Sequence, residues 1–211
     1  MNKQLKNIRI GGVPEHFNLP WLDTLGADLP AGSGITWVSQ PEGTGAMVAG
    51  LRAGELDAAL LLSEGAVAAY AATDPGFAIS AVYVDSPLEW GIHVPQGSRF
   101  ADEASINGAR YAISRFGSGS HLMSIAHARA KGWPSDSPQF VTVGTMAGAE
   151  AAFAAGRADV FFWERVMTQP LVDAGRLRRV GVFAAPWPAF VLCVASGVSS
   201  ADRARIEHVF E

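Results

Sequence analysis

Short apolar runs alternate with longer amphipathic stretches along almost the whole chain. Asp57–Leu62 and Val160–Trp163 are brief and continuously apolar, as expected for strands buried on both faces of a parallel sheet. Thr44–Ala53 and Ala147–Ala155 are apolar at helical spacing, and each is followed closely by a glycine that can end a helix. This order predicts an α/β protein with mostly parallel sheets flanked by helices.

The remaining elements continue the same alternation. In the first part we expect strands at Asn7–Val13, Ile35–Ser39, Ala78–Val84 and Glu89–Val94, with a turn at Asp85–Pro87, and helices at His16–Leu25 and Gly65–Ala72. In the second part we expect strands at Arg110–Ser114, Phe140–Val143, Arg179–Phe183 and Ala189–Ala195, and helices at His121–Lys131 and Arg165–Ala174.

One short motif occurs in both parts. Leu51-Arg-Ala-Gly-Glu-Leu-Asp57 and Phe153-Ala-Ala-Gly-Arg-Ala-Asp159 each place an aspartate three residues after a helix-ending glycine, and the two glycines are 102 residues apart. An apolar run and then a glutamate follow in each copy. Any strand–helix–strand unit can show this pattern, so coincidence stays open, but the motif favours two similar lobes.

A Gly/Ser-rich turn lies between the strand at Arg110–Ser114 and the helix that follows it. Phe116-Gly-Ser-Gly-Ser120 concentrates backbone N–H groups at a helix start, which suits an anionic or polar ligand group. The turn lacks the Lys-Ser/Thr of a P-loop and the third small residue of a dinucleotide fingerprint. The alternative is a tight turn with Ser120 as the N-cap and no ligand.

Composition and charge narrow the function classes. The chain has 211 residues, of which 49% are hydrophobic and 17% charged, so a folded domain or two small lobes fit. A net charge of −4 argues against a general nucleic-acid binder. Cys193 is the only cysteine and lies in an apolar run, which excludes an intrachain disulfide and favours a buried, inert thiol. We expect no metal and no cofactor.

The ends of the sequence bear on localisation. No apolar segment follows the first residues, so no secretory signal is expected, and no window is long enough for a membrane helix. The sequence as it stands predicts a cytoplasmic protein, or a periplasmic one if a leader was removed. The last helix starts after Ser199 without a terminating signal, so we expect a further C-terminal segment.

Four segments resemble the type II periplasmic-binding-protein superfamily, the solute receptors of ABC importers. They are Ile8-Arg-Ile-Gly-Gly-Val-Pro-Glu-His-Phe17, Gly50-Leu-Arg-Ala-Gly-Glu-Leu-Asp-Ala58, Ile113-Ser-Arg-Phe-Gly-Ser-Gly-Ser-His121 and Ala155-Gly-Arg-Ala-Asp-Val160. The similar branch is the nitrate/sulfonate/taurine and thiamine-pyrimidine type. The first and third segments look like receptor-like proteins that lack a leader.

The resemblance implies two lobes joined by two hinge crossings, residues 1–86 with 188–211 and residues 87–187. It implies that a ligand binds in the cleft between lobes, that closure buries it, and that an ABC permease is a partner. The ligand would be a small molecule such as a polar heterocycle or an amino or sulfonic acid. We expect the protein neither to bind nucleic acid nor to insert into a membrane.

Candidate ligand-binding residues lie at strand carboxyl ends and helix starts. Serine hydroxyls and N–H groups would bind the polar end, tryptophans would stack on a planar ligand, and glutamates would favour an amine. For single residues, core packing, an ordinary helix start or a salt bridge is the alternative. The candidates are Pro14, Glu15, His16, Glu42, Gly43, Thr44, Ser63, Glu64, Trp90, Ser114, Arg115, Gly117, Ser118, Gly119, Ser120, His121, Trp163 and Glu164.

Non-catalytic solute binding is the leading hypothesis. The alternatives are an enzyme on the same fold, similar to chorismate dehydratase or the thiamine-pyrimidine synthase, and a cytosolic ligand sensor similar to LysR-type effector modules. The cysteine-rich iron-binding stretch of the synthase has no counterpart here, because Cys193 stands alone. No helix-turn-helix precedes residue 8, which argues against a complete regulator.

Overall fold

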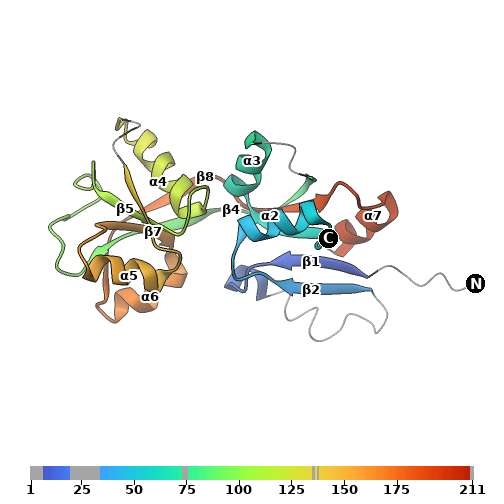
Figure 1. Ribbon diagram of the computed structural model, residues 1–211, viewed down its shortest axis with the longest axis horizontal. Coiled ribbons are helices and arrows are strands. Elements are labelled where there is room, and N and C mark those ends of the chain that lie inside the picture. The colour runs from blue at the N-terminus through green and yellow to red at the C-terminus, as the bar shows by residue number, and fades with distance from the viewer. Residues whose placement is uncertain (1–6, 20–33, 73–75, 135, 137, 210–211) are drawn as a thin grey trace, which may run out of the picture. The chain divides into compact units, whose positions relative to one another are not determined.

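The computed structural model describes residues 7–19, 34–72, 76–134, 136 and 138–209 (Figure 1). The chain divides into two compact units. Unit 1 comprises Met1–Asp85 and Pro188–Glu211, and unit 2 comprises Ser86–Trp187. None of the described helices is both long and apolar enough to span a membrane.

Unit 1 contains three parallel strands with helices on both faces. Strand β1 pairs with β2 on one side and with β3 on the other, and β8 adds an antiparallel partner to β3. The elements are β1 (Ile8–Gly12), a 3-10 helix η1 (His16–Asn18), β2 (Ile35–Ser39), α2 (Thr44–Ala53), β3 (Ala58–Leu62), α3 (Ser63–Ala72), the first part of β4 (Phe77–Pro95), the last part of β8 (Leu177–Ala195) and α7 (Ser200–Val209).

Unit 2 repeats this arrangement with different loops. Strand β5 is parallel to both β6 and β7, and β4 adds an antiparallel partner to β7. Its elements are the last part of β4, β5 (Arg110–Ile113), α4 (Gly119–Ala130), β6 (Gln139–Thr142), α5 (Met146–Ala154), β7 (Val160–Glu164), α6 (Arg165–Asp173) and the first part of β8. The hydrogen-bonded strand order is β2-β1-β3-β8-β4-β7-β5-β6.

Alternating strand residues supply a core on each face of the unit 1 sheet. Met47 and Leu51 of α2 pack with Ala59 and Leu61 on one face, and Ile206 of α7 packs with the strand residues of the other. Such two-sided burial explains why the strands read as continuous apolar runs. Cys193 is fully buried in the first of these clusters, and burial raises the pKa of its thiol to about 12.

The two strands that pass from one unit to the other are longer than the sequence predicts. The expected turn at residues 85–87 is wrong, because β4 runs unbroken from Phe77 to Pro95. The separate strands expected at residues 179–183 and 189–195 are likewise one strand, β8. Pro87 precedes the Trp90–His93 segment that pairs with β7, so its missing N–H removes no bond from that ladder.

Helix boundaries differ from the expected ones by two residues or more at three places. Helix α4 starts at Gly119 rather than His121, and its N-cap is Ser118 instead of Ser120. Helix α3 starts at Ser63, directly after β3, instead of at residue 65. The helix expected over residues 16–25 begins as η1, and its residues 20–25 lie outside the described part of the chain.

The repeated motif forms the same contacts in both units. In unit 1, Asp57 Oδ2 accepts hydrogen bonds from the main-chain N–H of Arg9 at 2.9 Å and from its Nε at 3.0 Å. In unit 2, Asp159 Oδ2 accepts the same two bonds from Arg110 at 3.0 and 2.8 Å. Each arginine also donates to the carbonyl of the helix-ending glycine. We call each set an Arg–Asp clamp, and it establishes the internal repeat.

Candidate functional site

Three parallel strands of unit 1 end at one edge, and the predicted residues of this unit follow them. Pro14, Glu15 and His16 come after β1, Glu42 and Gly43 come between β2 and α2 with Thr44 as the first residue of α2, and Ser63 and Glu64 come directly after β3. The main chain connects the first two segments, because Gln40 N–H donates to the carbonyl of Gly12 at 2.8 Å. Unit 1 therefore gathers its eight predicted residues at a single sheet edge.

The helix starts at this edge are packed tightly. A Cβ added at Gly65 would lie 2.5 Å from Cγ2 of Thr44, so the first turn of α3 lies directly against the first turn of α2. Gly43 precedes α2 with a φ of 76°, a conformation that favours glycine, and it offers no side chain as a cap. Glu42 is exposed, whereas Glu64 is buried. The buried Ser63 hydroxyl has no hydrogen-bond partner in the described structure.

Unit 2 places its predicted loop at the matching edge, after β5. Residues 114–118 form the turn and Gly119 begins α4. Gly117 adopts a φ of 78°, which favours glycine at this point of the turn. Ser114, Ser118 and Ser120 are buried, whereas Arg115 and Gly117 are exposed. The loop is thus a compact structure whose serines point inward.

Ser118 and Ser120 use their hydroxyl hydrogens within the loop, whereas the Ser114 hydroxyl lies 3.5 Å from that of Ser120. Ser118 Oγ donates to the carbonyl of Arg115 at 2.7 Å, so the contact of 3.0 Å between the Ser118 and Ser120 hydroxyls has Ser120 as its donor. Ser120 Oγ in turn accepts from the Ser114 N–H at 3.0 Å. The expected role of these hydroxyls is therefore indirect: they shape the loop around its backbone donors.

Two backbone donors remain at the start of α4. The N–H of His121 reaches the N-cap Ser118 Oγ, and the N–H of Leu122 reaches the carbonyl of Ser118. The N–H groups of Gly119 and Ser120 donate to no acceptor in the described part of the chain. Free N–H groups at the positive end of a helix dipole favour an anion.

His121 adds a side-chain donor to the loop. Its Nδ1 accepts a hydrogen bond from the Gly117 N–H at 3.1 Å, so in the neutral ring the proton lies on Nε2. Burial lowers the pKa of this imidazole, which favours the neutral form. The ring packs edge-on against Phe140 and Phe116, with centroid distances of 4.6 and 5.1 Å.

Arg115 supplies a positive charge next to the same loop. Its side chain is exposed, and it forms no ion pair with any residue that the structure describes. The salt bridge to a neighbouring glutamate, which the sequence left open, is absent in this part of the chain. The guanidinium is thus available to an anion together with the backbone donors of α4.

Glu164, Trp163 and Trp90 have structural contacts. The Glu164 carboxylate caps α6, because its two oxygens accept from the N–H groups of Val166 at 2.9 Å and Met167 at 2.6 Å. Trp163 stacks on Phe161 beside the alanine-rich core, with a centroid distance of 5.1 Å. Trp90 is 4% exposed, and its indole N–H has no acceptor in the described structure.

Sequence reasoning missed several residues at this edge. Phe116 and Val166 are large apolar side chains that are 67% and 51% exposed. Thr145 caps α5 by accepting from the Gly148 N–H at 3.1 Å, and so places a third helix start at the edge. The Gly-Thr pair before α5 resembles the Gly43-Thr44 pair that the sequence did select, and it would have pointed to this position.

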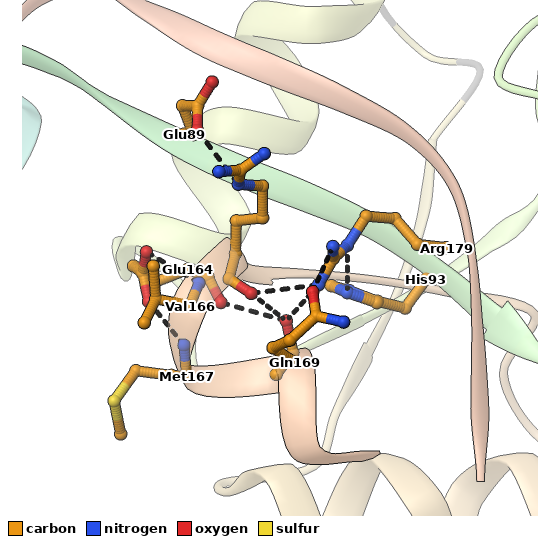
Figure 2. A network of polar contacts seen from close by, with 9 residues as sticks. Glu89, His93, Glu164, Val166, Met167, Gln169 and Arg179 are labelled. Atoms are coloured by element: carbon orange, nitrogen blue, oxygen red, sulfur yellow. Dashed lines mark hydrogen bonds and ion pairs between the residues drawn. The ribbon is translucent and has the colours of Figure 1, made fainter. Parts of the chain in front are cut away.

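A polar network around Arg179 and His93 holds the first turns of α6 (Figure 2). Arg179 of β8 donates from Nη2 to the carbonyl of Arg165 at 2.9 Å and from Nη1 to Gln169 Oε1 at 2.7 Å. Its Nε donates to His93 Nε2 at 3.3 Å, while His93 Nδ1 faces the Phe161 carbonyl at 3.2 Å. Burial, followed by the charge of Arg179, lowers the pKa of His93 to about 4. His93 is therefore neutral at pH 7.

Known proteins resemble the chain in sequence over part of its length and in structure over nearly all of it. A family described as Ca3427-like PBP matches residues 90–183. No curated protein matches the chain. The conserved CA3427 gene product of Candida albicans, which has the generic periplasmic-binding-protein fold, superposes with a TM-score of 0.87 at 25% identity over 97% of this chain and 68% of that one.

Two sulfonate-binding proteins share the fold at lower identity. The alkanesulfonate-binding protein SsuA of Xanthomonas axonopodis pv. citri, bound to MOPS, gives a TM-score of 0.79 at 18% identity, over 98% of this chain and 71% of that one. The aliphatic sulphonate binding protein SsuA of Escherichia coli gives 0.76 at 21%, over 97% and 70%. Strand order, the paired units and these matches agree that the chain has the periplasmic-binding-protein fold, and it resembles the type II proteins with this fold.

Proposed function

We propose that the chain is a receptor for a small polar solute whose anionic group binds at the edge of unit 2. The observation that carries the proposal is the hydrogen bonding of residues 114–121. Ser118 and Ser120 use their hydroxyl hydrogens within the loop, and the N–H groups of Gly119 and Ser120 have no acceptor in the described residues.

The charges around the loop support an anion. Arg115 is an exposed guanidinium without an ion-pair partner in the described structure, and neutral His121 has its donor on Nε2. Hydrogen bonds to charged groups contribute about 1.5–3 kcal/mol each, so only three of them near the upper limit would reach the roughly 8 kcal/mol of micromolar binding, and fewer or weaker ones would give millimolar binding. Exposed Phe116 adds an apolar surface for the organic part of the solute.

The structural neighbours favour the same ligand class. SsuA proteins bind sulfonates, and one of them is bound to MOPS, which combines a sulfonate with a heterocycle. We therefore propose organic sulfonic and amino acids as the first solutes to test. We also propose that the chain is the solute-binding component of an ABC-type importer and has a permease as its partner. Its location would be the periplasm if a leader has been removed, and the cytoplasm otherwise.

A matched pair of substitutions tests the placement of the anion. Gly119→Pro deletes one free N–H at the first position of α4, where proline is well tolerated and Ser118 already has the extended conformation (φ −75°, ψ 165°) that precedes proline. Gly119→Ala keeps the N–H and is the control. In calorimetric titrations with the best solute of a sulfonate and amino-acid panel, Gly119→Pro should weaken binding about 10-fold.

Two results would count against the proposal. Equal affinity of the proline and alanine variants would show that the anionic group does not bind at the start of α4. If no compound of the panel binds, the protein is not a receptor for sulfonates or amino acids. The same titrations, followed by analysis of the recovered solute, separate a receptor from an enzyme, because turnover of a bound solute would favour the catalytic alternative.

A further inference from the structure

The first residue of α6, Arg165, forms an ion pair that leaves most of its guanidinium available. Nε lies 2.9 Å from Oε2 of Glu89, and both side chains are about half exposed, at 45% and 49% (Figure 2). The two Nη nitrogens of Arg165 contact no acceptor in the described residues. The carboxylate therefore binds one donor of a group that offers five.

The pair lies at the same sheet edge as the predicted loop, entirely within unit 2. Trp90 of β4 is paired with Glu164 of β7, so Glu89 and Arg165 are the next opposing positions beyond that pair. Strand β5 lies on the other side of β7, and residues 114–121 follow it at the same edge. Arg165 is thus a second guanidinium at the edge that carries Arg115.

The main chain of Arg165 is fixed while its side chain is held by only one contact. Its carbonyl accepts from Arg179 Nη2 at 2.9 Å, and the fully buried Thr168 hydroxyl lies 3.0 Å from the carbonyl of Glu164 and 3.1 Å from that of Arg165. Just before it, Glu164 caps the helix. Exposed ion pairs contribute little net stability, so a competing anion could replace Glu89 without disturbing this anchored turn.

The same strands carry an unused donor. The indole N–H of Trp90, which is 4% exposed and adjacent to Glu89, has no acceptor in the described structure. Buried donors without an acceptor are rare, and each suggests a group that the protein alone does not provide. An oxygen-rich ligand group beside Arg165 would supply acceptors for the free Nη nitrogens, whereas the indole lies on the opposite face of the strand from Glu89 and would need a separate acceptor.

We propose that Arg165 is a specificity-determining residue that binds the anionic group of the solute, and that Glu89 competes with the solute for it. The inference rests on the proposed receptor function and adds a residue and a selection mechanism to it. Because Glu89 already neutralises Arg165, only a ligand with its own negative charge can replace that carboxylate. Neutral solutes would leave the pair intact and bind more weakly.

Titration with MOPS and with dimethyl sulfone, a neutral sulfonyl compound, tests this competition. Glu89→Gln should bind MOPS about 3- to 10-fold more tightly than the unchanged protein, because the competitor for Arg165 is removed. Arg165→Gln should bind MOPS about 10-fold more weakly, as expected for loss of one charge-assisted hydrogen bond. Dimethyl sulfone binding should change less than 2-fold in both variants.

Another arginine–glutamate ion pair of unit 2 provides the control. Arg176 lies beyond the far end of α6, and its Nε is 2.8 Å from Oε1 of Glu150 on α5. Glu150→Gln and Arg176→Gln make the same charge changes and should leave MOPS affinity within 2-fold. Equal effects of both pairs would show a general charge effect and would overturn the proposal.

The remaining outcomes separate this inference from the proposed function. If Arg165→Gln binds MOPS as well as the unchanged protein, the role of Arg165 is refuted while the receptor function stands. If neither the unchanged protein nor Glu89→Gln binds MOPS, the inference fails, and the receptor function still stands if another solute of the panel binds.

Discussion

The two units share one framework but fill it with different side chains. Each has the Arg–Asp clamp, with Nε-to-carboxylate distances of 3.0 Å in unit 1 and 2.8 Å in unit 2. Above the clamp, unit 1 packs Leu56 against Gly11 and Gly50, where added Cβ atoms would lie 2.7 and 3.1 Å from the leucine. The equivalent positions of unit 2 hold Ala112, Ala152 and Ala158, buried in one cluster.

The comparison separates what the framework requires from what it tolerates. The clamp uses the same residue types in both units because it joins a strand start, a helix end and the next strand through specific hydrogen bonds. The packing layer needs only a constant total volume, and one leucine with two glycines replaces three alanines. The strand carboxyl ends differ most, with a 3-10 turn after β1 and a serine-bonded loop with a longer helix after β5.

The largest effect on the free energy of unfolding is expected when the leucine and glycine packing of unit 1 is replaced by the alanine packing of unit 2. Leu56→Ala should lower the free energy of unfolding by about 3 kcal/mol, because it leaves a cavity. Gly11→Ala should also destabilise, since its methyl would lie 2.7 Å from the leucine. The double variant copies unit 2 at these positions and should lose less than the sum. Urea denaturation of all four proteins measures this cycle, and strictly additive losses would contradict it.

The second-largest expected effect is a difference between the two units in how much stability they lose at acid pH. The buried polar residues described in unit 1 include no histidine, whereas His93 of unit 2 is fully buried with a pKa lowered to about 4. Between pH 6.5 and about 4 the unfolded chain binds a proton at this residue that the folded chain does not. Unit 2 should therefore lose roughly 2–3 kcal/mol of stability as the pH falls through this window.

Hydrogen exchange followed by mass spectrometry measures this difference. Peptides of β4 and β7 around His93 should lose protection between pH 6.5 and 4, after correction for the intrinsic exchange rate, whereas β1 and β3 should change less. The control is His93→Asn, which keeps a donor for the Phe161 carbonyl and should reduce the dependence, leaving the part that comes from the fully buried His127, whose pKa burial also lowers. An unchanged slope in this variant would assign the acid sensitivity to another group.

The smallest effect compares the two clamps directly. The Asp57 side chain is 6% exposed and that of Asp159 is 22% exposed. Asp57→Asn should lower the free energy of unfolding by about 2 kcal/mol, because the buried hydrogen bonds to Arg9 lose their charge. Asp159→Asn should cost less, since water screens its pair with Arg110. Thermal unfolding of both variants checks the order, and a larger loss at Asp159 would reverse the argument.

The pH dependence of the unit 2 clamp has a defined sign. Hydrogen bonds from Arg110 hold the pKa of Asp159 below its usual value. The clamp therefore contributes its stability above the ordinary carboxyl pKa and loses it as the pH falls through the lowered one. In the Asp159→Asn variant, the free energy of unfolding should no longer show this loss as the pH falls.

Much of the fold was predictable from the sequence, but less of the site. Short apolar runs marked β3 and β7 because both faces of each strand are buried. The pattern failed at β4, where residues 85–87 are exposed and contain a proline, and these features look like a turn when the partner strands are unknown. The Gly/Ser loop was found from its residue types, but its hydroxyls could not be assigned, because partners within three residues compete for the same hydrogens.

The sequence alone determined the alternation of strands and helices, the repeated glycine and aspartate, and the backbone donors at the start of α4. These follow from local periodicity and residue type, which need no knowledge of distant neighbours. Only the tertiary structure decided that Asp57 and Asp159 bind arginines at the start of another strand and that Glu89 meets Arg165. Long-range contacts depend on strand order and register, and the order places residues far apart in the chain at one edge of a sheet.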